Sequence, residues 1–157
     1  MVLSVMVLLA APVGLLADVR PASTGPSDSV AIHAFWSALD SIWSTRDADA
    51  FAQLFTEDAS FDFIGRPTSL ATRDSIRAYF VSQFSRQRPE LRHRTTLRRV
   101  FPLAADMAAI DGEVAIVDGA GAGPIIARLP ITGVMARTSA GWRIRLLRAY
   151  AAASDGP

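Results

Sequence analysis

WSTRDADAFAQLFTEDASFDFIG, residues 43–65, contains the change from helical to strand periodicity on which the fold depends. Over residues 59–64, Phe61 and Phe63 alternate with polar residues, so the two rings share one side of an extended chain. Such a strand buries one face against a core and leaves the other face more polar. The Gly-Arg-Pro sequence at residues 65–67 then predicts a turn.

Helical periodicity flanks this strand on both sides. Asp28 or Ser29 can cap a first helix, Asp47 or Asp49 can cap a short second helix, and a third helix starts at Thr72. Apolar residues spaced by three and four predict one buried stripe on each helix. These stripes are Ile32, Phe35, Trp36, Leu39, Ile42 and Trp43, then Phe51, Leu54 and Phe55, then Ile76, Tyr79, Phe80 and Phe84.

Four strands are predicted in the rest of the chain, at residues 91–103, 107–117, 125–137 and 142–150. Their short connections, one of them the glycine-rich stretch 118–123, favour antiparallel neighbours. Helices followed by a run of strands indicate an α+β fold rather than an alternating α/β fold. We therefore expect a curved antiparallel β-sheet wrapped over three N-terminal helices, with a cavity between the two layers.

Composition removes several kinds of chemistry. The 157 residues suit one domain, and the net charge of +1 gives no general reason for nucleic-acid binding. Lysine and cysteine are absent, which excludes Schiff-base lysines, thiol nucleophiles, disulfides and thiolate metal sites. His33 and His93 are too few for a histidine-only zinc site, so no metal and no cofactor are predicted. The arginine-rich residues 86–99 lack interleaved aromatics and are interpreted as a solvated outer sheet face or a contact to acidic residues of a second subunit.

The two ends of the chain differ from its body. Residues 1–17 are nearly all apolar, which is typical of a secretory leader, and residues 18–28 resemble a linker. The domain is then predicted at residues 29–150, with a tail at 151–157. We expect a secreted or periplasmic protein with no stable membrane association after leader removal. An uncleaved leader that anchors the chain in a membrane, or a buried helix, is the alternative.

Two segments carry a family resemblance. Residues 43–61, and the Gly-Trp-Arg-Ile sequence at 141–144, resemble the opening and the last strand of SnoaL-like domains in the nuclear-transport-factor-two-like superfamily. The SgcJ/EcaC-type subgroup is the most similar, over residues 29–150. The resemblance implies a cone-shaped, cystatin-like fold, usually homodimeric, with a mostly apolar pocket. The superfamily includes isomerases, dehydratases, hydrolases, cyclases and non-catalytic binding modules, so the fold alone does not give the function.

The same resemblance allows one activity to be tested on the residues. Ketosteroid isomerases need a carboxylate base, a phenol and a protonated acid. The corresponding positions in this chain hold Phe63, Leu39 and, near the acid position, Gly133. Asp62 is one residue from the base position, and one step along a strand turns a side chain to the other face. Ketosteroid isomerase activity is therefore excluded.

The remaining catalytic candidates are His93, Arg148 and Tyr150. His93 alternates with outward arginines on its strand, so it is predicted to face the cavity, where it could act as an acid or base. Arg148 and Tyr150 are predicted to face inward near the end of the last strand, where an arginine could bind a substrate oxygen. The alternatives are a hydrogen-bonded structural histidine, and an Arg148 salt bridge to Asp40 or Asp62.

Two functions remain after these exclusions. The first is a protein that binds a small hydrophobic molecule, as a homodimer, without an established reaction. The second is a cofactor-free isomerase, cyclase or hydrolase that acts on a hydrophobic carbonyl compound with His93 as acid or base. The predicted ligand-binding residues are Trp36, Leu39, Asp40, Trp43, Phe61 and Phe63.

Overall fold

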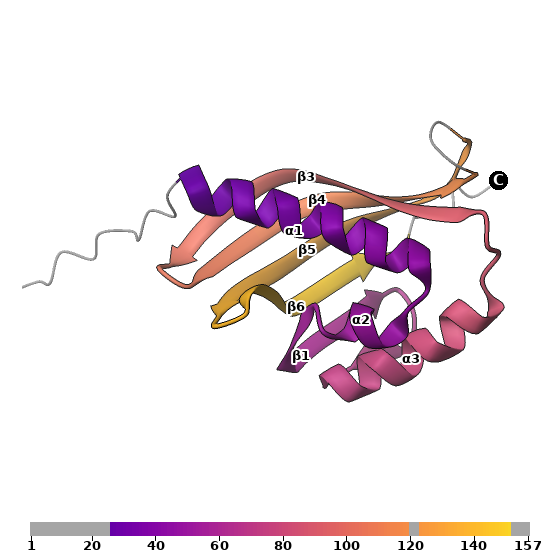
Figure 1. The fold of residues 1–157 in the computed structure, drawn as a ribbon, viewed down its shortest axis with the longest axis horizontal. Helices are drawn as coiled ribbons and strands as arrows, with labels where there is room; N and C mark the ends of the chain where they lie inside the picture. The colour runs from indigo at the N-terminus through magenta and orange to yellow at the C-terminus, as the bar shows by residue number, and fades with distance from the viewer. Residues whose placement is uncertain (1–25, 120–122, 152–157) are drawn as a thin grey trace, which may run out of the picture.

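The computed structural model describes residues 26–119 and 123–151, in which three helices pack against a curved six-stranded sheet (Figure 1). The helices are α1 (Pro26–Thr45), α2 (Ala48–Ala52) and α3 (Arg73–Arg86), and the strands are β1 (Phe55–Ile64), β2 (Thr68–Leu70), β3 (Leu91–Ala104), β4 (Met107–Asp118), β5 (Ile125–Thr138) and β6 (Gly141–Tyr150). The α+β class and the predicted helices and strands are confirmed. The short strand β2 is an addition that the sequence pattern did not predict.

The sheet has the strand order β2-β1-β6-β5-β4-β3. Strands β3 to β6 form the expected antiparallel meander, and β2 pairs with β1 in the same antiparallel sense. The pair β1–β6 is parallel, which departs from the expected all-antiparallel sheet. No tight turn joins these two strands, since β2, α3 and the strands β3 to β5 lie between them in sequence, so a short connection does not fix their direction.

Local sequence signals explain where the helices begin and end. Arg46 has a positive φ of 59° and ends α1, and the Asp47 carboxylate then caps α2 by accepting a hydrogen bond from the Ala50 N–H. Thr72 starts α3 through a capping box with Ser75. The prediction that α2 continues through Phe55 is wrong, because Phe55 pairs with Ile144 of β6 and begins β1. Sheet pairing overrides the helical spacing at that point.

The core lies between the helices and one face of the sheet. Ile32, Trp36, Leu39 and Trp43 of α1 are buried, which confirms the predicted stripe. A cluster of phenylalanine rings from α2, α3 and β1 forms the part of the core that lies away from the start of α1. Its ring centroids lie 4.3–6.1 Å apart among Phe51, Phe55, Phe61, Phe80 and Phe84. In Figure 1, α1 lies over the β3 side of the curved sheet, while α2 and α3 lie at its β1 side.

Some predictions fall outside the described residues. These are the leader at 1–17, most of the linker at 18–28 and the tail after Ala151. The helix α1 begins at Pro26, so the last three positions of the predicted linker are helical. Among the described helices, none has the length and apolar character needed to span a bilayer.

Candidate functional site

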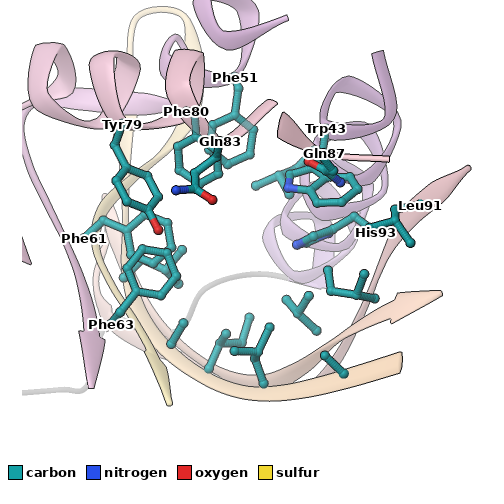
Figure 2. Close-up of a pocket in the computed structure, with 18 of the residues that line it drawn as sticks. Trp43, Phe51, Phe61, Phe63, Tyr79, Phe80, Gln83, Gln87, Leu91 and His93 are labelled. Atoms are coloured by element: carbon teal, nitrogen blue, oxygen red, sulfur yellow. The ribbon is translucent and has the colours of Figure 1, made fainter. Parts of the chain in front are cut away.

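A cavity of about 380 Å³ lies among the helices and the inner face of the sheet, and residues of both line it. Figure 2 shows Phe61, Phe63 and Tyr79 on one wall and Trp43 and His93 on the opposite wall. Aliphatic side chains of β4, β5 and β6 form the floor of the cavity: Val114, Ile116, Ala127, Leu129, Ile131, Leu147 and Ala149. The cavity that the fold was expected to enclose is therefore present, and its surface is mostly apolar.

Most of the predicted ligand-binding residues lie on this cavity. Five of them line it directly: Trp36, Leu39, Trp43, Phe61 and Phe63. Asp40, the sixth, contacts the cavity residue His93 instead. Each of the five is on the buried stripe of α1 or on the inward side of β1, so the periodicity that predicted burial also predicted the cavity wall. Their part in binding stays a prediction.

His93 is the polar group with the most defined geometry in the cavity. Its Nδ1 lies 2.6 Å from Oδ1 of Asp40, which is on α1 and 53 residues earlier in the chain. The same carboxylate accepts hydrogen bonds from the backbone N–H of Thr95 at 2.8 Å and from its hydroxyl at 2.7 Å. The side chains of His93 and Asp40 are only 10% and 20% exposed. The Asp40 carboxylate thus holds the imidazole ring of His93, and two donors of Thr95 hold the carboxylate.

The hydrogen-bond pattern indicates which ring nitrogen of His93 carries the hydrogen. An ionised carboxylate only accepts hydrogen bonds, so the hydrogen is assigned to Nδ1 of His93, which donates a hydrogen bond to Asp40. In the neutral imidazole, Nε2 is then the atom with a free lone pair. Figure 2 shows the ring directed into the cavity, and the Trp43 ring lies against it with centroids 5.1 Å apart. The arrangement can place one basic nitrogen against a ligand in an apolar environment.

Arg148 and Tyr150 do not line this cavity, so the prediction that they face inward with His93 is wrong. The register between β5 and β6 shifts at Arg145, which is an extra residue in its strand. After this bulge the inward positions are Leu147 and Ala149. Arg148 is on the other face, with Nε 3.9 Å from the Asp62 carboxylate, which is the alternative that the sequence left open. Tyr150 contacts the hydroxyl of Thr132 there, at 3.4 Å.

The mouth of the cavity contains polar residues that were not predicted. Tyr79, Gln83 and Arg86 are spaced by four and three on α3, so they share one helix face, and Arg66 and Gln87 also line the cavity. The helical periodicity predicted Tyr79 as a core residue. Gln83 and Arg86 follow it at helical spacing, so extending the face of Tyr79 toward the end of α3 could have identified both. The charged lining residues are arginines, with His93 as the remaining titratable group besides Tyr79.

Two buried polar atoms of the cavity lining have no hydrogen-bond partner in the described part of the chain. They are Nε1 of Trp36 and Nε2 of Gln87. A buried donor without an acceptor costs about 1–3 kcal/mol, so both atoms are places where an acceptor would be favourable. Among residues 26–119 and 123–151, His, Asp and Glu side chains form no group of three that could hold a metal ion.

Gly133 explains why an acid is not accommodated at the position that the family resemblance assigns to one. A Cβ at this residue would lie 2.7 Å from the carbonyl oxygen of Leu146, which is too close for the backbone to remain in place. The close packing of the sheet leaves no room for a side chain at this position, which agrees with the exclusion of ketosteroid isomerase chemistry.

Charged groups away from the cavity form ion pairs at the protein surface. The hydrogen bond from Arg77 lowers the pKa of the exposed Asp49 carboxyl, and the hydroxyl of Thr56, helped by the charge of Arg145, lowers the pKa of Asp58. Arg94, Arg98 and Arg99 are exposed on β3, as one of the two interpretations of the arginine-rich stretch predicted, whereas Arg86 ends α3 and lines the cavity. Arg88 pairs with Asp118 at 2.8 Å and Arg98 with Glu113 at 3.2 Å within the same chain, so these acids do not require a second subunit.

Comparison with solved structures supports the fold. A protein of unknown function with a cystatin-like fold from Nostoc punctiforme PCC 73102 superimposes with a TM-score of 0.71 at 11% identity, over 86% of this chain and 97% of that chain. A domain of unknown function with the same fold from that organism gives 0.70 at 21% identity, over 84% and 82%. A ketosteroid isomerase-like protein from Erwinia carotovora atroseptica gives 0.58 at 17% identity, over 80% and 94%.

These identities are too low to transfer an activity. No curated protein matches the chain. The model of the SnoaL-like domain family matches residues 27–148, a range that contains the cavity-lining residues from Trp36 to Leu147. The chain therefore belongs to the SnoaL-like domain family.

Proposed function

We propose that this protein binds one small hydrophobic molecule in the cavity between the helices and the sheet. The observation that carries the proposal is the cavity itself, about 380 Å³ that aromatic and aliphatic side chains surround without filling. Ligand pockets typically have volumes of about 300–1,000 Å³ and a mostly apolar lining with a few placed polar groups. Transfer of an apolar ligand from water to such a wall contributes about 25 cal/mol per Å² of buried surface.

Native mass spectrometry of the full chain, purified under mild conditions, tests the proposal. We expect a small molecule to be retained by the wild type and lost from Ala127→Phe, because Ala127 lines the cavity and a phenyl ring there occupies the space of a ligand. Ala78→Phe is the matched control, since Ala78 is exposed on α3. Retention of the same molecule by Ala127→Phe would place binding elsewhere and contradict the proposal.

A second candidate function rests on the His93–Asp40 pair. The 2.6 Å contact fixes the tautomer of His93, so Nε2 is a candidate general base for a hydrophobic carbonyl compound. Asp40 then acts as a positioning residue that stabilises the imidazolium formed when His93 takes a proton. Arg148 and Tyr150 no longer belong to this hypothesis. The candidate reaction is a cofactor-free isomerisation, cyclisation or hydrolysis.

Proton exchange at a carbonyl compound tests this candidate without knowledge of the natural substrate. In D₂O, a base that removes a proton next to the carbonyl of 2-acetylnaphthalene leads to replacement of that proton by deuterium. We expect the wild type to exchange the methyl protons about 10²-fold faster than His93→Gln, the lower end of general-base contributions. Equal exchange rates of the two proteins, at matched binding of the ketone, would eliminate the catalytic candidate and leave the binding function.

We further propose that the chain is an exported homodimer of the SgcJ/EcaC-type subgroup. The apolar residues 1–17 support export, and the sequence at 141–144 supports the subgroup. The outer face of the sheet presents half-buried Leu146 and Val134 at its centre, which supports self-association there. Light scattering on the full chain should give twice the monomer mass, and Leu146→Glu should reduce it. A monomeric wild type would contradict the dimer.

A further inference from the structure

The charges at the mouth of the cavity are of one sign. Arg66 follows β1 and Arg86 ends α3, and both line the cavity and are exposed. Arg86 donates hydrogen bonds to the carbonyl and the hydroxyl of Ser82 on its own helix. In the described part of the chain, no carboxylate lies within 4.0 Å of either guanidinium, whereas Arg148 on the other sheet face has Asp62. Among the described residues, those that line the cavity include no aspartate or glutamate.

The neighbouring side chains present further donors at the same place. Gln83 lies on the helix face of Arg86, and Gln87 follows directly, with a buried Nε2 that has no acceptor among the described residues. Figure 2 shows Gln83 and Gln87 reaching over the cavity from α3 and its end. Guanidinium and amide N–H groups are the donors that recognise a carboxylate. The mouth therefore offers hydrogen-bond donors and positive charge without a compensating acid.

The interior excludes charge, which restricts where a ligand can carry it. Apart from His93, which is already paired with Asp40, the walls are Trp36, Trp43 and phenylalanine rings above the aliphatic floor, and a charged group buried there without a partner is strongly disfavoured. A ligand that uses both regions has an apolar body inside and an anionic group at the mouth. Building on the proposed binding function, we propose that the natural ligand is a hydrophobic carboxylic acid whose carboxylate is held by Arg66 and Arg86.

Two probes of nearly equal shape test this inference. 2-Naphthoate carries a carboxylate where 2-acetylnaphthalene carries a neutral methyl ketone, so a change in their relative affinities between the wild type and a variant reports the contact to the charged group. Isothermal titration of the full chain at neutral pH should show the carboxylate binding about tenfold more tightly, as two partly exposed charge contacts allow. The preference should shrink between about 0.02 and 0.3 M salt, because exposed charges are screened.

Variants at the mouth assign the preference to residues. Arg66→Gln with Arg86→Gln should bind the two probes equally while its affinity for the ketone stays within about twofold of the wild type, which also reports an intact cavity. Each single variant should lose about threefold in the preference. Arg94→Gln is the matched control, because Arg94 is exposed on β3 away from the cavity lining, and it should keep the full preference.

The outcomes separate this inference from the function on which it rests. Equal binding of both probes by the wild type, or a preference that survives the double variant, would overturn the carboxylate proposal and leave apolar binding in place. Failure of both probes to bind the wild type would contradict binding of a hydrophobic molecule in the cavity, and the inference would fall with it.

Discussion

Asp40 holds together α1 and the first half of β3, so its removal should destabilise the fold measurably. Its carboxylate accepts three hydrogen bonds of 2.6–2.8 Å, from His93 and twice from Thr95. Hydrogen bonds to a charged group contribute about 1.5–3 kcal/mol each, but shared contacts are not additive and the side chain is 20% exposed to water. We therefore expect Asp40→Ala to lower the free energy of unfolding by about 3 kcal/mol.

Urea unfolding of the full chain, followed by tryptophan fluorescence, measures this loss. With a slope of about 2 kcal/mol per molar urea for a domain of this size, the midpoint should fall by roughly 1.5 M. Asp40→Asn keeps one acceptor oxygen and should lose less than half as much. Asp111→Ala is the control, since Asp111 is half-buried on the other sheet face and makes no hydrogen bond or ion pair through its side chain in the described residues. An Asp40→Ala midpoint equal to that of Asp111→Ala would refute the structural role of this carboxylate.

Three further predictions concern stability. Phe55 is fully buried in the aromatic cluster, so Phe55→Ala should cost about 3–5 kcal/mol in urea unfolding, while Phe101→Ala, at an exposed ring, should cost less than about 1 kcal/mol; similar losses would contradict the assigned core. Thr72→Ala removes the capping box of α3 and should cost about 1 kcal/mol, with Thr72→Ser close to the wild type, and an unchanged midpoint for the alanine variant would count against the cap. Because the Arg77 hydrogen bond lowers the pKa of Asp49 below its ordinary 3.8, this pair stabilises the fold above that value and its contribution is lost as the pH falls through the lowered pKa. Urea midpoints measured from about pH 5 downward should therefore decline less steeply in Asp49→Asn than in the wild type, and parallel declines would contradict the effect of this pair.

Periodicity was sufficient for the features that depend on one element alone. The stripe on α1 identified Trp36 and Trp43 as buried, and strand alternation placed His93 toward the cavity. Both deductions work because a helix repeats every 3.6 residues and a strand every two, so a side chain's direction follows from its neighbours. The same reasoning gave the aromatic wall of the site.

Strand alternation gave the wrong side-chain directions after the β-bulge in β6. The extra residue Arg145 in β6 reverses the direction of every following side chain, so Leu147 faces the cavity and Arg148 does not. A bulge depends on the register with β5 and β1, and the local sequence of β6 does not contain that register. The parallel direction of β1 beside β6 was missed for a related reason, since it follows from the closure of the whole sheet.

The pairing of His93 with Asp40 also needed the tertiary structure. Asp40 was predicted as a ligand-binding residue on the helix, but its hydrogen bonds go to β3, 53 and 55 residues away in sequence. Contacts at this separation depend on where α1 crosses the sheet. The arginines at the mouth belong to the same class, because Arg66 follows β1 and Arg86 ends α3, and only the folded chain brings both to the lining of one cavity.

Binding of a neutral hydrophobic probe to the cavity is the most direct test of the proposed function. Isothermal titration of the full chain with 2-acetylnaphthalene should show one site per chain in the wild type and in Ala78→Phe. Ala127→Phe, whose new ring occupies the cavity, should show no measurable binding. Saturable binding that is equal in the wild type and in Ala127→Phe, or no binding to the wild type, would contradict the account.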